Sequence, residues 1–201
     1  MFRSKAEQKV ADAGYDPARL PPGQYLTEKW PVLHAGDVPD IDLATWDFKV
    51  FGEVESPITL TWEQLQELPA TEITIDIHCV TRWSRFDTTF KGVHWSELAK
   101  LTGPRPNGRF VVAHAEQGFT ANLPIEAIED DNALIAYEAD GEPLTPDHGG
   151  PVRLMVPSRY FWKSAKWLTG LELLDHDEPG FWERYGYHND ADYWKEQRYS
   201  F

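Results

Sequence analysis

The sequence predicts one mixed α+β domain, rich in β-sheet, in which short helices occupy the connections between short strands. Stretches of alternating apolar and polar residues recur along the 201 residues, separated by turns that contain Pro and Gly. Brief helical patterns lie between some of these stretches, and no internal repeat is present. An apolar fraction of 41% supplies enough hydrophobic residues for a sizeable core. Together these observations favour an α+β domain.

The N-terminal part is expected to lie on the surface of the domain. Residues 1–12 are charged and contain few apolar residues, which predicts a surface helix. Residues 14–40 contain many Pro and Gly residues without a clear period, so they should form an extended segment that wraps the body. Alternation of Trp46, Phe48 and Val50 then predicts the first strand.

The rest of the chain alternates between predicted strands and short predicted helices. Thr61 and Gln64 have the spacing of a capping box, which predicts a helix that runs through Leu68. Pro124 is expected near the first position of another brief helix, and the Asp-Gly pair at 140–141 is typical of a tight turn. The remaining predicted elements are a helix at 95–101 and strands at 73–79, 110–115, 133–138, 152–156 and 168–174.

Charge and composition exclude several classes of function. A formal net charge of -14 argues against binding to nucleic acids or anionic membranes, because both require a positively charged surface. No segment approaches the ~18 consecutive apolar residues that a membrane span requires. A single cysteine excludes a disulfide within the chain and any multi-cysteine zinc or iron–sulfur site. Because residues 1–12 lack the apolar run of an export signal, we expect a cytoplasmic protein.

The single cysteine, Cys79, ends a predicted strand in which isoleucines alternate with polar residues. This alternation places Cys79 on the inward face, and His78 on the opposite face, where it would be a poor base for the thiol. Arg82 and Arg85 follow in a polar, cationic turn that is suited to stabilising a thiolate. Free cysteines are also commonly small buried hydrophobes, so position alone leaves a structural role equally open.

A second stretch stands out because it is cationic in an acidic chain. No carboxylate occurs between Asp147 and Glu172, and the Gly-Gly pair at 149–150 permits close approach of a ligand to the backbone. The cations of this stretch are Arg153, Arg159, Lys163 and Lys166. We interpret them as a site for an anion such as phosphate, in preference to a set of ion pairs with surface acids.

Three motifs, in order over about residues 26–174, resemble those of the sulfite oxidase family. Residues 79–84, Cys-Val-Thr-Arg-Trp-Ser, look like the molybdenum-ligating loop of its bacterial branch, which includes the protein-methionine-sulfoxide reductase catalytic subunit. Residues 148–168 look like the family's cofactor-binding stretch, and residues 32–39 are similar to its first cofactor-contact loop. The turn after Cys79 differs from the loop of the sulfite oxidases themselves, which argues against sulfite as the substrate.

The resemblance implies a sulfite oxidase-type domain at residues 26–201, with an N-terminal extension at 1–25. It implies molybdenum on a molybdopterin, with Cys79 as the thiolate ligand and Arg82 near the metal, where it would meet an anionic substrate. The residues that it implies for holding the pterin and its phosphate are His34, His114, His148, Arg153, Lys163, Ser164 and Lys166.

The function that follows from the resemblance is oxygen-atom transfer to or from a small-molecule substrate. A separate protein would exchange electrons with the site, and the acidic composition suggests that this partner is basic. Two alternatives stay open from the residues alone. One is a hydrolase in which Cys79 acts as the nucleophile with a distant histidine, and the other is a non-catalytic module that binds anions.

Overall fold

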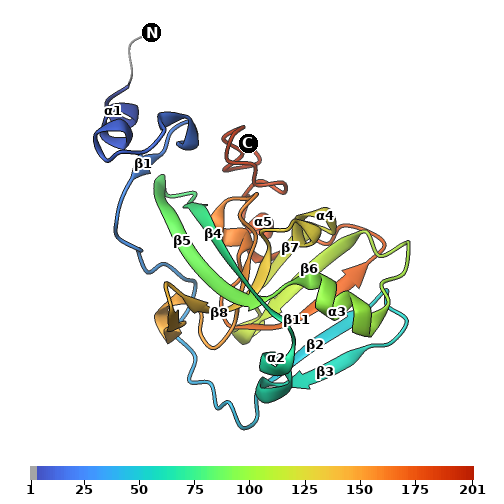
Figure 1. Ribbon diagram of the computed structural model, residues 1–201. Helices are drawn as coiled ribbons and strands as arrows, with labels where there is room; N and C mark the ends of the chain where they lie inside the picture. Colours follow the sequence, from blue (N-terminus) through green and yellow to red (C-terminus); the bar gives the residue numbers. More distant parts are fainter. Residues whose placement is uncertain (1–3) are drawn as a thin grey trace.

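The computed structural model describes residues 4–201 and contains two β-sheets with short connecting helices, as the predicted α+β class requires (Figure 1). One sheet has the order β1 (Tyr25–Leu26), β5 (Trp83–Val93), β8 (Leu134–Ala139) and β10 (Arg153–Met155), with β4 (Ala70–His78) paired to β5 and β9 (Glu142–Pro143) paired to β8. The other has the order β3 (Ile58–Thr61), β2 (Asp47–Gly52), β11 (Leu168–Leu174), β6 (Phe110–Ala115) and β7 (Thr120–Pro124).

Short helices lie in the connections. The α-helices are α1 (Lys5–Asp12), α2 (Trp62–Glu67), α3 (Trp95–Thr102), α4 (Glu126–Glu129) and α5 (Phe181–Arg184). The 3-10 turns are η1 (Pro17–Arg19), η2 (Glu116–Gly118), η3 (Pro146–His148) and η4 (Phe161–Lys163). Within residues 4–201, none of these helices has the length and apolarity needed to pass through a lipid bilayer.

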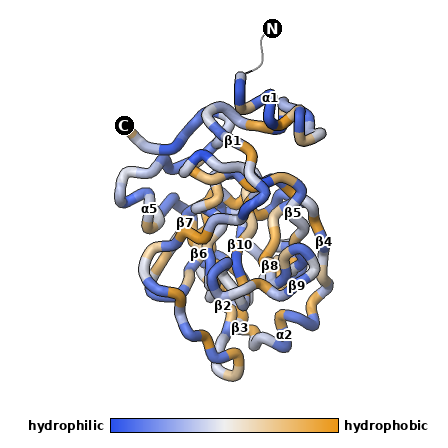
Figure 2. Tube along the Cα trace, turned by 90° about the vertical axis from the view of Figure 1, so that its left-hand side faces the viewer, coloured by the Kyte–Doolittle hydropathy of each residue, from blue (hydrophilic) through white to orange (hydrophobic). Residues whose placement is uncertain are grey.

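The apolar side chains form a large core, a smaller one beside it and a third, minor cluster of Val10, Leu20 and Phe86. Residues of β2, β6, β7 and β11 pack with residues of β8 and β10 in the large core, which includes Phe48 and Leu171. The smaller core lies along β4 and β5 and contains Ile75, Ile77 and Cys79. Hydrophobic stretches lie among the strands of the body in Figure 2, with hydrophilic segments between them. Cys79 therefore faces inward with the isoleucines, as their alternation predicts.

Local signals in the sequence predict several elements well. Thr61 caps α2 by accepting a hydrogen bond from the backbone of Gln64, whose side chain accepts in return from the Thr61 backbone. The strands β6 and β11 have the predicted bounds. The surface helix is α1, although residues 1–3 of the prediction lie outside the described part of the chain. The predicted boundary at residues 25 and 26 falls within β1, which pairs in parallel with β5.

Two local predictions are wrong. The cationic turn ends at Arg82, and Trp83 already begins β5, which pairs with β4 over most of its length. Buried residues occur on both faces of β5, and buried Ser84 and Thr88 are polar, so apolar alternation is lost there. Pro124 ends β7 instead of starting a helix, and the helix begins at Glu126.

Candidate active site

A pocket of about 530 Å³ lies where the turn after β4 meets the segments around η4 and the N-terminal extended segment. Five of the residues predicted for the site line it together: His34, Cys79, Arg153, Ser164 and Lys166. Aromatic side chains supply much of its remaining wall, namely Trp30, Trp83, Phe119, Phe161, Trp162, Trp167, Phe181, Trp182 and Tyr187. The tertiary structure thus brings the thiol and part of the cationic stretch to one cavity.

Cys79 is held at one side of this pocket by a tight turn. Its backbone amide donates to Trp83 and its carbonyl accepts from Arg82, each over 2.9 Å. The Thr81 hydroxyl donates to Sγ of Cys79 over 3.2 Å. Burial raises the pKa of the thiol, while the bonds from Thr81 and the charge of Arg198 oppose that rise. A metal ion that replaces the thiol proton would relieve this cost of burial.

Arg153 is almost completely buried, with 1% of its surface exposed, at the start of β10. Its guanidinium donates to the carbonyls of His148 and Ser164 over 2.7 and 2.8 Å and lies over the ring of Phe161 at 4.2 Å. Burial lowers its pKa. Its Nε has no hydrogen-bond partner among the described residues, so one donor of a buried cation is available beside the pocket.

Ser164 and Lys166 lie on the same side of the pocket as Arg153. The Ser164 hydroxyl accepts from the amide of Val156 over 2.9 Å. Lys166 donates to the carbonyl of Asp147, and burial, followed by the charge of Arg153, lowers its pKa to about 8. In the described chain neither Lys166 nor Arg153 has a carboxylate oxygen within ion-pair distance. A bound anion would therefore compensate two cations that the protein leaves unpaired.

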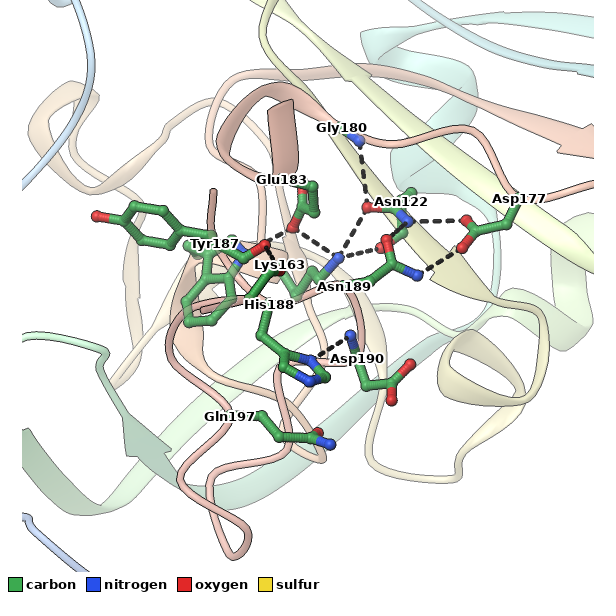
Figure 3. A network of polar contacts seen from close by, with 12 residues as sticks. Asn122, Lys163, Asp177, Gly180, Glu183, Tyr187, His188, Asn189, Asp190 and Gln197 are labelled. Carbon is green, nitrogen blue, oxygen red and sulfur yellow. Dashed lines mark hydrogen bonds and ion pairs between the residues drawn. The ribbon is translucent and has the colours of Figure 1, made fainter. Parts of the chain in front are cut away.

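Lys163 is placed elsewhere, in a buried polar network (Figure 3). Its ammonium group donates to the carbonyl and the side-chain oxygen of Asn122, each over 2.8 Å, and pairs with Glu183 at 2.7 Å. Burial lowers the pKa of Lys163, and the charge of Glu183 opposes the change. This side chain joins η4 to β7 and α5, and its donors are occupied by protein groups.

The remaining predicted residues do not line the pocket. His148 stacks on Trp30 with ring centroids 4.0 Å apart, and burial together with the charges of Lys166 and Arg153 lowers its pKa to about 4. His114 lies on β6 and bonds to Glu172 of β11 over 2.8 Å. Arg82 is exposed, with a φ of 77°, and is not among the residues that line the pocket.

His78 lies in a different environment from Cys79, as the strand alternation predicts. It is buried, its Nδ1 is 2.8 Å from the Ser84 hydroxyl, and it lines a second hollow on the other side of β4. A hydrogen-bonded nucleophile–base pair between His78 and Cys79 is not formed.

Sequence reasoning missed several contributors to the site. Trp30 lines the pocket from the extended segment at residues 14–40, and Phe119 lines it from the connection between β6 and β7. No sequence motif pointed to either residue. The side chain of Gln24 donates to the carbonyl of Cys79, and that of Arg198 donates to the carbonyl of Val80. The chain contains nine Trp, eight Tyr and ten Phe residues, and this richness in aromatic residues is the sequence signal for the pocket wall. Nothing local in the sequence marked Gln24 or Arg198.

The residues present fit an organic cofactor that carries both a phosphate and a metal. Among residues 4–201, no group of three or more His, Cys, Asp or Glu side chains is arranged to hold a metal ion. A metal beside Cys79 would therefore need further ligands from a cofactor. Buried donors at Trp83 Nε1 and Arg153 Nε have no protein partner, and Lys166 and Arg153 are unpaired cations. The pocket is thus complementary to a cofactor that brings its own metal ligands, and the Cys79 thiol lines the same pocket.

Comparison with known proteins identifies the class of protein. Residues 35–182 match the family described as "Oxidoreductase molybdopterin binding domain", and the chain belongs to this family. The protein is a molybdenum-cofactor-dependent oxidoreductase related to the sulfite oxidases, and molybdopterin is its cofactor.

Two curated relatives show different degrees of similarity. The chain is 45% identical over 183 residues to the uncharacterized oxidoreductase YuiH of Bacillus subtilis, covering 90% of this chain and 92% of that one. It is 33% identical over 157 residues to the protein-methionine-sulfoxide reductase catalytic subunit MsrP of Gluconobacter oxydans, covering 69% of this chain and 50% of that protein.

Larger proteins share only part of their length with the chain. The match to mitochondrial sulfite oxidase of Homo sapiens has 27% identity and covers 83% of this chain and 37% of that protein. Among solved structures, the sulfane dehydrogenase SoxCD from Paracoccus pantotrophus has a similar fold, with a TM-score of 0.66 and 24% identity. That match covers 72% of this chain and 42% of the SoxCD chain.

Proposed function

We propose that the protein uses Cys79 as the thiolate ligand of molybdenum and transfers an oxygen atom to or from a small substrate in the pocket. The observation that supports this most directly is the shared cavity. Cys79 lies on one wall, and Arg153, Ser164 and Lys166 line the same pocket from a distant part of the sequence. A metal-bearing pterin with a phosphate group is complementary to both parts of that wall.

Each of these residues has a role that its contacts support. Arg153 offers its free Nε and Lys166 its ammonium group to the phosphate. His34 lies at the exposed side of the pocket, with its ring 5.4 Å from that of Trp167, where it can contact the pterin. His148 stays neutral behind Trp30 and supports that ring.

The bound cofactor supplies the two-electron redox chemistry, and the chain positions and shields it. Thr81 orients the Cys79 sulfur, and the aromatic rings of Trp83 and Tyr187 exclude water from that side of the pocket. Arg82, His114 and Lys163 stay predictions for the site. Their positions in the structure favour roles outside the pocket lining.

A separate electron-transfer protein, of basic surface charge, is part of the proposal because the chain has a formal net charge of -14. A cytoplasmic location is also proposed, supported by the single, unpaired Cys79. Pull-down with basic and acidic redox proteins tests the first point, and cell fractionation tests the second.

Metal analysis tests the central claim. Protein purified from a host that makes molybdopterin should contain close to one molybdenum atom per chain, and Cys79→Ser should lose dye-linked redox activity. Alkylation provides the contrast with a cysteine hydrolase, because a metal-bound thiolate is protected until the cofactor is released. Molybdenum-free wild-type protein with a freely alkylated Cys79 would contradict the proposal.

A further inference from the structure

The turn that carries Cys79 is held from behind by two buried side chains. Gln24 Nε2 donates to the carbonyl of Cys79 over 3.0 Å. Arg198 Nη1 donates to the next carbonyl, that of Val80. Two consecutive carbonyls of a short turn are thus each held by a long-range side-chain donor, which restricts the position of the thiol between them.

Both donors come from outside the region that matches the family, which spans residues 35–182. Gln24 directly precedes β1, whose parallel pairing with β5 places it beside the turn. Arg198 belongs to the segment after α5, in which its carbonyl accepts from the amide of His188. These contacts therefore involve two segments that lie outside the matched region.

Arg198 also connects the turn to the cofactor-binding segment. Its guanidinium lies over the ring of Tyr160 at 4.8 Å, and Tyr160 directly precedes η4, which Ser164 follows. It further contacts the carbonyl of Pro22 at 3.5 Å. One side chain therefore contacts three parts of the chain. They are the Cys79 turn, the N-terminal segment at Pro22, and Tyr160, which precedes residues 161–166, here called the cofactor loop.

The charge of Arg198 is largely uncompensated. Only 8% of its surface is exposed, and the carboxylate of Glu196, 3.8 Å away, is itself half exposed. A carboxylate in water at that distance neutralises a buried guanidinium incompletely. Its Nη1 donates to the carbonyl of Val80, the residue next to Cys79. The positive charge therefore lies beside the turn at which a metal bound to Cys79 would sit.

We propose that Arg198 is a positioning residue that holds the Cys79 turn against the cofactor loop and raises the reduction potential of the metal centre through its positive charge. The inference rests on the proposed ligation by Cys79. Reduction adds negative charge to the centre, and a nearby buried cation stabilises the more negative state. Gln24 holds the adjacent carbonyl without adding charge. Comparing variants at Gln24 with variants at Arg198 therefore separates the effect of turn geometry from the effect of charge.

The experiment compares four variants of the full-length holoenzyme. Arg198→Met removes the charge and the hydrogen bond, Arg198→Gln removes the charge but keeps a donor, and Arg198→Lys keeps the charge. Gln24→Met removes the neighbouring hydrogen bond at constant charge. For each we measure molybdenum per chain, the melting temperature and the midpoint potential in a mediated redox titration.

The expected result is a lower midpoint potential in Arg198→Met and Arg198→Gln, with Arg198→Lys and Gln24→Met close to wild type. Unchanged potentials in the two variants without charge would overturn the proposal, as would an equal shift in Gln24→Met. If Arg198→Met and Arg198→Gln fold but lose molybdenum, their potentials are not measurable and the molybdenum content of Arg198→Lys is the test. Molybdenum retained in Arg198→Lys supports the proposal, and an equal loss of molybdenum there contradicts it. Wild-type protein that contains no molybdenum is a different outcome, because it would contradict the proposed function itself.

Discussion

The Thr81 hydroxyl donates a hydrogen bond to Sγ of Cys79 over 3.2 Å, inside a turn of four residues that also fixes the Cys79 backbone. The bond opposes the effect of burial, which raises the pKa of the thiol. Thr81 therefore favours the thiolate, the form that binds metals. This contact links the sequence motif after Cys79 directly to the chemistry of the pocket.

Thr81→Val should slow alkylation of Cys79 in cofactor-free protein. A hydrogen bond to the thiolate contributes about 0.5–1.5 kcal/mol, so its loss should reduce the iodoacetamide rate at neutral pH by roughly two- to tenfold. Thr81→Ser keeps the hydroxyl and is the control. Equal rates for the valine and serine variants would show that the bond does not stabilise the thiolate.

Arg153→Met should release the cofactor from folded protein. The substitution removes the buried positive charge and the free Nε donor assigned to the phosphate, and a hydrogen bond to a charged group is worth about 1.5–3 kcal/mol. We expect at least a tenfold loss of molybdenum per chain, measured by elemental analysis. Arg105→Met, at a largely exposed position, is the control. Normal metal content in Arg153→Met would contradict the assigned role.

Lys163→Met should lower stability more than it lowers intrinsic cofactor affinity. It leaves the buried Glu183 carboxylate unpaired and removes two bonds to Asn122, so the free energy of unfolding should fall by about 3–5 kcal/mol. Urea unfolding measures this loss, with the exposed Lys100→Met as control. If Lys163→Met unfolds like wild type but lacks molybdenum, Lys163 contacts the cofactor instead.

Anion binding by cofactor-free protein should weaken as pH rises through about 8. Lys166 has a pKa lowered from 10.5 to about 8 by burial and by Arg153, so it loses its charge above that pH. Sulfate, which does not titrate in this range, is the probe, and calorimetry from pH 7 to 9 is the measurement. Lys166→Met should bind weakly at every pH; a wild-type affinity independent of pH would refute the role of Lys166.

The lowered pKa of Lys166 also determines how the free energy of unfolding changes with pH. Between about pH 8 and 10.5 the unfolded chain binds a proton at Lys166 that the folded chain has lost. The contribution of Lys166 to the free energy of unfolding therefore rises with pH across that window. Unfolding at pH 8 and pH 10 should show this rise in wild type and a smaller one in Lys166→Met.

Local patterns predicted those parts of the fold that depend on local interactions. Alternation identified β6 and β11, and the capping box identified the start of α2. The same alternation failed for β5, because Ser84 and Thr88 are polar yet buried and strand order in the sheet decides their environment. A pattern of hydrophobicity reports burial only where buried residues are apolar.

For the site, the sequence by itself determined that Cys79 faces inward and that a cationic stretch occurs in an acidic chain. The tertiary structure decided which cations are available: Lys163 is neutralised by Glu183, while Arg153 and Lys166 remain unpaired. It also placed Gln24 and Arg198 behind the Cys79 turn. Periodicity is a property of neighbouring residues, whereas the pairing of a charge depends on groups that only folding brings within a few ångströms.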